Sequence, residues 1–286
     1  MFPEQFRIPL GQWINHAIDW LVETHGQAFE SAGNALLKVL VVLEQGLRGA
    51  PWWLVIAIIG MLAFHATRRA LVALALMAAM FAVGMLGLWD LAMQTLSLML
   101  AAIALGIVVG LPVGIAMAQS KRMRAVILPL LDVMQTMPSF VYLIPALMLF
   151  GLGKVPALLA TVIYAAPPLI RLTDLGIRLV DREIVEASDA FGASTRQKLL
   201  GVQLPLALPN IMQGINQMTM MALAMVVIAS MIGARGLGEE VLLGIQRLDF
   251  GRGAEAGLSI VALAIIFDRI TQAYGRAQDQ TRRAAG

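Results

Sequence analysis

The sequence predicts an all-α, polytopic membrane protein with about seven transmembrane helices and an amphipathic segment at its N-terminus. Of the 286 residues, 59% are hydrophobic and only 14% are charged, whereas a soluble domain carries about a quarter charged residues. The mean hydropathy of the chain is +0.79. Its apolar runs approach the length that crosses a bilayer, and they lack the period-two alternation of an outer-membrane barrel. These observations predict a bundle of membrane-spanning helices.

Residues 1–50 are predicted to form an amphipathic helical segment rather than a span. Trp13, Ile14 and Leu21 share one helical face, while Asp19 and Glu23 lie elsewhere on the helix. Two alternatives stay open for this segment. It either lies in the membrane interface or packs on the spans of its own chain.

Residues 51–90 are predicted to hold two additional spans and residues 91–275 five more, followed by a tail at 276–286. The seven expected spans are 51–67, 70–89, 91–118, 126–151, 155–174, 209–233 and 255–275. The first is short for a hydrocarbon core of about 30 Å. Helix breakers interrupt the third and fourth spans, where we expect them to allow bending. These breakers are Gly106, Gly110, Pro112, Gly114, Pro138 and Pro145.

Lysines and arginines gather in the short loops on one side of this seven-span order. They occur at 68–69, at 121–124, between 171 and 198, and in the tail. The positive-inside rule therefore predicts that the 181–209 loop and the C-terminus are cytoplasmic and that the N-terminus is outside. The expected location is the cytoplasmic (inner) membrane of a bacterium.

The stretch between the last two spans, residues 233–253, is rich in glycine and has a mildly amphipathic centre at 241–248. One interpretation is a short re-entrant or interfacial helix that touches a partner outside. The other is a plain connecting loop.

The loop at 181–209 is the longest charged interval between apolar segments. Apolar residues recur at helical spacing in its first half, opposite a row of acids. Glu186 is placed near the start of this short helix, where a helix dipole favours an acid. Gly192 can take a positive φ and turn the chain. Ser194 or Thr195 can then cap a second short helix.

Pro205 and Pro209 are expected to end this second helix and to open the next span. Two short amphipathic helices at a sharp angle predict a knob that fits a groove on a partner protein. The alternative is an ordinary solvated loop between spans.

Several kinds of chemistry are missing from the sequence. There is no Walker A lysine motif, so the chain is not expected to hydrolyse ATP itself. It has no cysteine, which excludes disulfides and cysteine-ligated metals. The acids nearest the spans are expected to make interfacial ion pairs rather than a proton relay. These acids are Asp132, Asp174 and Asp268, and the neighbouring bases are Arg124, Arg171 and Arg269.

Eighteen methionines leave two alternatives open, an adaptable path for a substrate or ordinary helix packing. The residues singled out as a possible path are Thr136, Pro138, Met221 and Met225.

The 181–209 loop also resembles a known signature. Glu186, Ala187 and Ser188 are followed by Gly192 and, ten residues later, by a segment that ends in Leu204-Pro205. The same order marks the cytoplasmic loop of permease subunits of binding-protein-dependent ABC importers. Ser188 replaces an alanine of that signature, and Val202 replaces an isoleucine. The resemblance implies that Glu186, Ala187, Ser188, Gly192, Leu204 and Pro205 couple the chain to an ATPase.

Further stretches resemble the permease subunits of glycine betaine, proline betaine and choline importers. They are 135–140, 150–153, 166–173 and 226–238, within a resemblance that covers roughly Leu91 to Thr271. The resemblance implies a type I ABC importer fold with a five-helix core. It also implies two permease copies, two cytoplasmic ATPase subunits that bind the ATP, and a separate substrate-binding protein outside. No cofactor is expected in this chain, nor any nucleic-acid partner.

Three other functions are set against this interpretation. The first is an ABC permease for another small osmolyte or an amino-acid-like solute. The second is an ion-coupled secondary transporter, which predicts repeated halves and charges at the membrane midplane. The third is a membrane-embedded enzyme, which needs convergent acids, bases or metal ligands. The sequence shows neither repeats nor such convergence.

Overall fold

The structure is a computed structural model that describes residues 9–285, and every secondary-structure element in that range is helical. The first six α-helices are α1 (Leu10–Gly49), α2 (Trp52–Thr67), α3 (Ala70–Met85), α4 (Trp89–Gln119), α5 (Lys121–Thr136) and α6 (Leu143–Phe150). The remaining α-helices are α7 (Lys154–Arg178), α8 (Arg182–Ala190), α9 (Thr195–Lys198), α10 (Leu204–Ala229), α11 (Leu237–Arg247) and α12 (Phe250–Ala285). The predicted all-α fold is confirmed.

Four helical stretches are each long and apolar enough to cross a membrane. They are α4, α7, the stretch Thr195–Ile232 that contains α10, and Phe250–Gly275 of α12. The expected spans 91–118, 155–174, 209–233 and 255–275 all fall on these stretches. Two sharply bent helix pairs raise the number of candidate spans to six within the described range. The apolar helix α3 has only 16 residues, and so it is only about 24 Å long.

Residues 126–151 do not form the single span expected from the sequence. Helix α5 ends at Thr136, and the helical segment Ser139–Phe150 continues at 113° to it. The ring of Pro138 disfavours helical backbone at the preceding residue, and Met137 is extended, with φ −69° and ψ 136°. Pro138 therefore breaks the helix outright instead of bending it.

The glycines of α4 do not bend the helix, although they were expected from the sequence to allow bending. Helix α4 is continuous from Trp89 to Gln119 despite Pro112. A Cβ at Gly114 would lie 2.6 Å from Cβ of Thr173 and 2.8 Å from the carbonyl oxygen of Ile170 on α7. These glycines thus let two helices approach closely, as small residues do inside membrane bundles.

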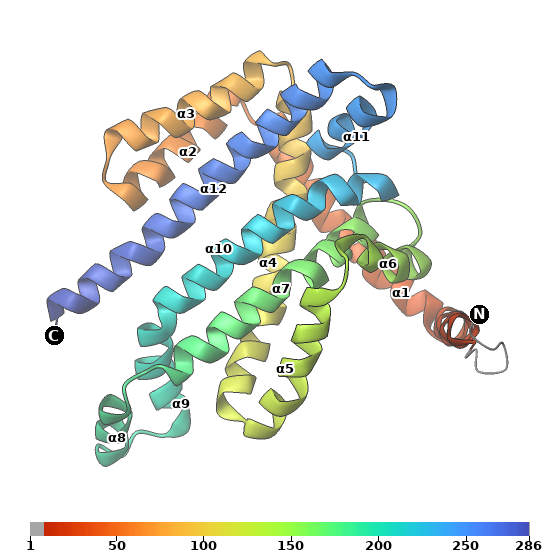
Figure 1. Cartoon of the computed structure of the whole chain (residues 1–286). Coiled ribbons are helices and arrows are strands. Elements are labelled where there is room, and N and C mark those ends of the chain that lie inside the picture. Colours follow the sequence, from red (N-terminus) through yellow and green to blue (C-terminus); the bar gives the residue numbers. More distant parts are fainter. Residues whose placement is uncertain (1–8, 286) are drawn as a thin grey trace, which may run out of the picture.

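The centre of the molecule is the packing of α7 between α4 and α10, with α12 on the far side of α10 (Figure 1). The hairpin of α2 and α3 packs against α12. Helices α8 and α9 lie together at one end of the bundle, whereas α6 and α11 lie at the other (Figure 1). The structure thus separates the 181–209 loop from the 233–253 stretch. That stretch contains a helix, α11, and its contact with a partner outside stays a prediction.

Helix α1 is one continuous helix of 40 residues, and it meets α2 at 102°. Its buried residues are Gly33, Leu40 and Glu44, all in the C-terminal half, where it contacts α4, α6 and α7. The N-terminal half exposes large apolar side chains, Trp13 and Trp20 at 60% each. Of the two alternatives for this segment, packing on the chain's own spans therefore applies only to the C-terminal half of α1.

Candidate functional site

Helix α8 forms the first arm of the 181–209 loop, and both of its ends are capped. The carboxylate of Asp181 accepts a hydrogen bond from the Glu183 amide at 2.9 Å, which fixes the N-terminus. At the C-terminus, the Gly192 amide donates to the Asp189 carbonyl and the Ala193 amide donates to the Ser188 carbonyl. This is a Schellman motif, and it ends the helix where the sequence predicted a turn.

Gly192 occupies the left-handed position of that motif, with φ +75°. No atom lies within 4 Å of the place where its Cβ would be. The position therefore favours glycine because of its backbone conformation alone, since left-handed φ is costly for residues with a Cβ. The predicted role of Gly192 as the bend is confirmed.

The second arm begins with a capping box. The Gln197 amide donates to the Ser194 hydroxyl, and the Ser194 amide donates to the Gln197 side chain. Lys198 then donates to both carboxylate oxygens of Asp189, at 2.7 and 3.0 Å. This ion pair ties α9 back to α8 and holds the angle between the two arms. The Ser-x-x-Gln spacing was a readable signal for the box.

The prediction that Pro205 and Pro209 end the second helix is wrong. After α9 the chain passes through a π-helix at Leu199–Gln203, where the Leu204 amide donates to the Leu199 carbonyl five residues back. Pro205 then stands at the second residue of α10, directly after this wider turn, and it does not end the helix. The wide turn carries the helix through, so the second arm and the span form one helix.

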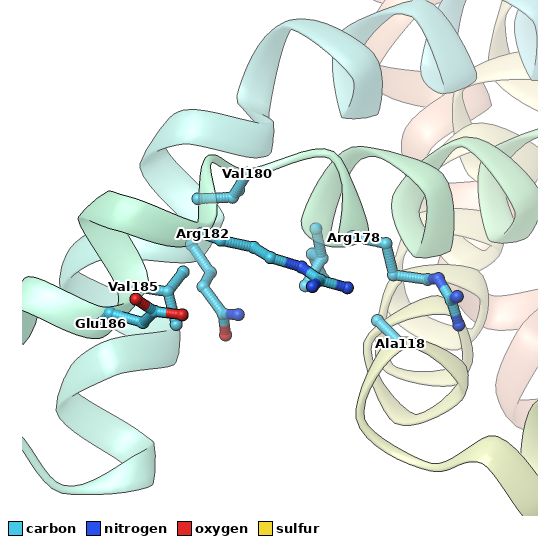
Figure 2. Close-up of a pocket in the computed structure, with 8 residues that line it drawn as sticks. Ala118, Arg178, Val180, Arg182, Val185 and Glu186 are labelled. Atoms are coloured by element: carbon cyan, nitrogen blue, oxygen red, sulfur yellow. The ribbon is translucent and has the colours of Figure 1, made fainter. Parts of the chain in front are cut away.

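Glu186 lies in the second turn of α8 rather than near its start, because the helix begins at Arg182. The helix dipole fades beyond the first turn, so it acts on Glu183 instead. Glu186 lines a cavity of about 210 Å³ between α8 and the ends of α4 and α7 (Figure 2). It is exposed, as is Ala187, while Ser188 is half-buried.

Neither α8 nor α9 buries a residue completely. Phe191 is 93% exposed, Leu200 52% and Ile184 43%. Leu204 is half-buried and Pro205 exposed, so the six signature residues reach from the knob to the base of α10. An exposed apolar surface on a rigid projection is typical of a protein-binding site.

The four possible path residues lie in three different surroundings. Thr136 and Pro138 are exposed at the break after α5, and the Thr136 hydroxyl donates to the Val133 carbonyl at 2.9 Å. Met225 on α10 is fully buried beside Tyr142. Met221 is half-buried against another cluster, so the structure does not bring all four together.

The acids of the spans form the expected pairs in two of three cases. Asp174 is buried and binds the Arg124 guanidinium at 3.0 Å, and Asp132 pairs with Arg171. Asp268 instead accepts a hydrogen bond from Asn216 at 3.2 Å. Ion pairs thus fasten α5 to α7, and within the described residues no group of His, Cys, Asp and Glu could hold a metal.

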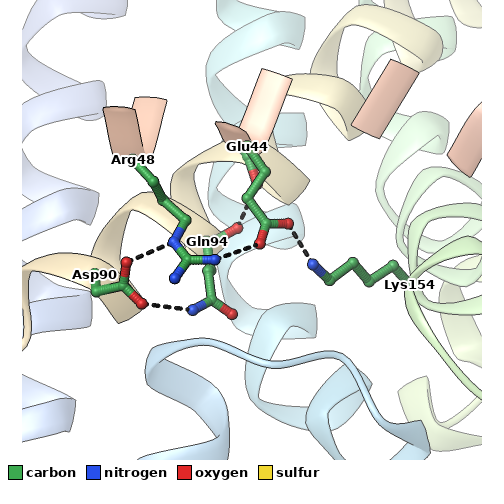
Figure 3. A network of polar contacts seen from close by, with 6 residues as sticks. Glu44, Arg48, Asp90, Gln94 and Lys154 are labelled. Carbon is green, nitrogen blue, oxygen red and sulfur yellow. Dashed lines mark hydrogen bonds and ion pairs between the residues drawn. The ribbon is translucent and has the colours of Figure 1, made fainter. Parts of the chain in front are cut away.

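A second polar cluster is shown in Figure 3. Its residues line a cavity together with α11, which lies at the end of the bundle opposite the knob (Figure 1). Glu44 of α1 is only 6% exposed and accepts a hydrogen bond from Lys154 of α7. Arg48 donates to Asp90 of α4 at 2.5 Å, and this bond raises the pKa of the Arg48 guanidinium. Gln94 donates to the other oxygen of Asp90 at 3.0 Å. The cluster joins the N-terminal helix to the core.

We expect Glu44→Gln to weaken this attachment, because it leaves the half-buried Lys154 without its acid. The expected loss of unfolding free energy is about 1–3 kcal/mol, measured by thermal unfolding in detergent and by protease cleavage within α1. Glu30→Gln is the matched control, since Glu30 is an exposed acid on the same helix. Equal unfolding temperatures for both variants would show that the Glu44 pair does not hold α1.

A family of known proteins matches most of this chain. The model described as "Binding-protein-dependent transport system inner membrane component" matches residues 106–280. The chain is 48% identical to the glycine betaine/proline betaine transport system permease protein ProW of Escherichia coli, over 94% of this chain and 76% of that protein. It is 46% identical to the glycine betaine transport system permease protein OpuAB of Bacillus subtilis, over 93% and 94%.

Solved structures match the fold as well. An inward-facing structure of the MetNI methionine ABC transporter aligns with a TM-score of 0.57 and 22% identity, over 70% of this chain and 96% of that one. At this identity the likeness concerns the fold alone. It confirms the helical architecture of an ABC importer permease.

Proposed function

The chain belongs to the family of binding-protein-dependent transport system inner membrane components, and from that premise we propose that it imports a quaternary ammonium compound into the cytoplasm. It is a multi-pass membrane component of an ABC importer. The observation that carries the proposed substrate is the identity of 44–48% with glycine betaine permeases over more than nine-tenths of the chain. The proposed substrates are glycine betaine, proline betaine and choline.

More distant relatives support the same chemical class. The chain is 42% identical over 66% of its length to a trimethylamine N-oxide permease of Ruegeria pomeroyi, and 31% identical over 62% to a choline permease of Bacillus subtilis. The named solutes share a methylated nitrogen with cationic character. Selection among them is assigned to the separate binding protein, where aromatic rings attract such a group by cation–π contacts.

The proposed importer contains two copies of this chain and two ATPase subunits. Each copy offers one knob, made by α8 and α9, and paired ATPases need two matching docking sites, which closed two-fold symmetry supplies. The exposed Phe191 and Ile184 support docking of an ATPase at the knob. The signature residues Glu186, Ala187, Ser188, Gly192, Leu204 and Pro205 are proposed to couple ATP hydrolysis to transport.

The binding protein is proposed to dock at the opposite end. A polar cavity of about 510 Å³ lies there, lined by α1, α4, α11 and the start of α7 and α12. It contains charges of both signs, among them Arg235 and Glu239. Such a surface suits a partner that is held in register by complementary charge.

These assignments need the knob in the cytoplasm and α11 outside. A cysteine at Ala193 in the naturally cysteine-free chain is therefore expected to resist a membrane-impermeant thiol reagent in intact cells and to react after permeabilisation. The physical reason is the lysine and arginine asymmetry of the loops. Phe250→Cys, at an 88% exposed position of the opposite end, serves as the control that labels from outside. Labelling of the Ala193 cysteine in intact cells would reverse the proposed topology.

Reconstitution tests the function itself. Proteoliposomes with the permease, its ATPase and its binding protein are expected to accumulate glycine betaine only when ATP is present on the side of the membrane that carries the ATPase. Glycine is the matched control solute, because it lacks only the three methyl groups. Uptake driven by an ion gradient without ATP would favour a secondary transporter, and equal uptake of glycine would favour an amino-acid importer.

A further inference from the structure

Two exposed arginines and one acid, Glu186, line the cavity behind the knob. Arg178 belongs to the last turn of α7 and Arg182 to the first turn of α8, and both side chains line the 210 Å³ cavity. Neither side chain makes a hydrogen bond or an ion pair with another described residue. Seven ion pairs hold other charged groups of the described chain, whereas Arg178 and Arg182 are unpaired and share one cavity.

Arg182 is in an unfavourable place for a cation. The N-terminus of a helix carries partial positive charge, which disfavours a cation in the first turn. Glu186 stands four residues further along α8, the spacing at which opposite charges pair on a helix. The Arg182 side chain nevertheless extends away from Glu186 and toward Arg178 (Figure 2). Two like charges thus face the same cavity, and an anion between them would relieve both unfavourable interactions.

The position of the cavity indicates the kind of anion. Ala118 closes it from the last turns of α4, and Ile177 from the last turn of α7. Both helices are candidate membrane spans, so the cavity lies where a span meets the water. Phosphate groups of lipids lie at this level, and free phosphates reach it from the aqueous side. Guanidinium groups bind phosphate oxygens through paired, charge-assisted hydrogen bonds.

We propose that Arg178 and Arg182 form a binding site for a phosphate group, supplied by a lipid headgroup or by free phosphate. A phosphate bound there bridges the end of span α7 and the start of α8. It therefore sets the angle at which the knob leaves the membrane. The effect on coupling rests on the proposed function, whereas the binding itself does not.

The test is a calorimetric titration of inorganic phosphate into the full-length permease, without ATPase, in an uncharged, phosphate-free detergent at constant ionic strength. The wild-type chain is expected to bind phosphate, and Arg178→Gln and Arg182→Gln are expected to bind it at least about ten-fold more weakly. Arg182→Lys keeps the charge and is expected to retain part of the affinity. Arg196→Gln removes an exposed arginine of α9 away from the cavity and is the matched control.

Nanodiscs that contain phosphatidylglycerol separate the two sources. If added phosphate no longer binds in them, the lipid headgroup occupies the site in a membrane; if it binds as before, free phosphate is the ligand. The proposal is overturned if phosphate fails to bind in the phosphate-free detergent. It is also overturned if the two glutamine variants bind as tightly as the wild type, or if they lose affinity only as much as Arg196→Gln. None of these results depends on transport, so ATP-driven uptake remains a separate test of the function.

Discussion

A valine in place of Gly192 is expected to reduce ATP-driven uptake at least about ten-fold while leaving the chain inserted in the membrane. Gly192 has a φ of +75°, which costs an ordinary residue about 1–2 kcal/mol and a β-branched residue more. Since no neighbour lies within 4 Å of its would-be Cβ, the strain acts on the turn alone. The knob is expected to lose its shape, and ATPase docking to fail with it.

The substitutions at this position should follow the backbone preference. Asparagine tolerates a positive φ better than alanine does, and alanine better than valine, so uptake in proteoliposomes should fall in that order. Gly201→Ala is the matched control, because this glycine of the π-turn also has open space around it and no positive φ. Wild-type uptake by the Gly192→Val variant would mean that the 181–209 loop is only a connector.

Glu186→Lys complements this series, because it reverses a charge on α8 and leaves the turn intact. If the acid faces a basic groove of the ATPase, the variant should copurify with less ATPase at low salt, and high salt should reduce the difference. The shape and the charge of the knob are thereby tested separately.

An alanine at Gly238 is expected to prevent the normal packing of α11 on α10. The added Cβ would lie 2.6 Å from the carbonyl oxygen of Val226 and 2.8 Å from Cα of Val227. Backbone atoms inside a packed helix cannot move aside as a flexible side chain can, so the expected cost is about 3 kcal/mol or more. The variant should show a markedly lower unfolding temperature in detergent and a low yield of folded protein.

Gly257→Ala provides a control of the opposite sign. Gly257 lies within α12, and no atom is found within 4 Å of its would-be Cβ. Replacing a helical glycine by alanine stabilises a helix by about 1 kcal/mol where space allows. A Gly238→Ala variant that unfolds at the same temperature as Gly257→Ala would contradict the close approach of α11 and α10.

The fold class was predictable because hydropathy and length are properties of continuous segments. Four of the expected spans fall on helices α4, α7, α10 and α12 for this reason. The sequence could not show that Pro138 breaks its helix while Pro112 leaves α4 continuous, because both prolines lie in apolar runs. Their outcomes depend on neighbouring helices, which either satisfy the freed backbone groups or leave the chain to turn.

In the site, too, features set by neighbouring residues were predictable, whereas contacts between residues far apart in the chain were not. The bend at Gly192 and a cap at Ser194 or Thr195 were predicted because a turn and a helix cap depend on adjacent residues, and the structure uses Ser194. The pair of Glu44 with Lys154 joins positions 110 residues apart, and no pattern along the chain indicates it. The convergence of Arg178 and Arg182 on one cavity likewise depends on the bend between two helices.

The uninterrupted helix from Thr195 to Ile232 has a mechanical consequence. Its 38 residues make a rod about 57 Å long, with one end in the knob and the other near α11. The other arm, α8, is joined to α7 through a non-helical bend at Asp181. We therefore expect a displacement of the knob to be carried into α10 along continuous helix. The bend at Asp181 gives the first arm no such continuous connection to α7.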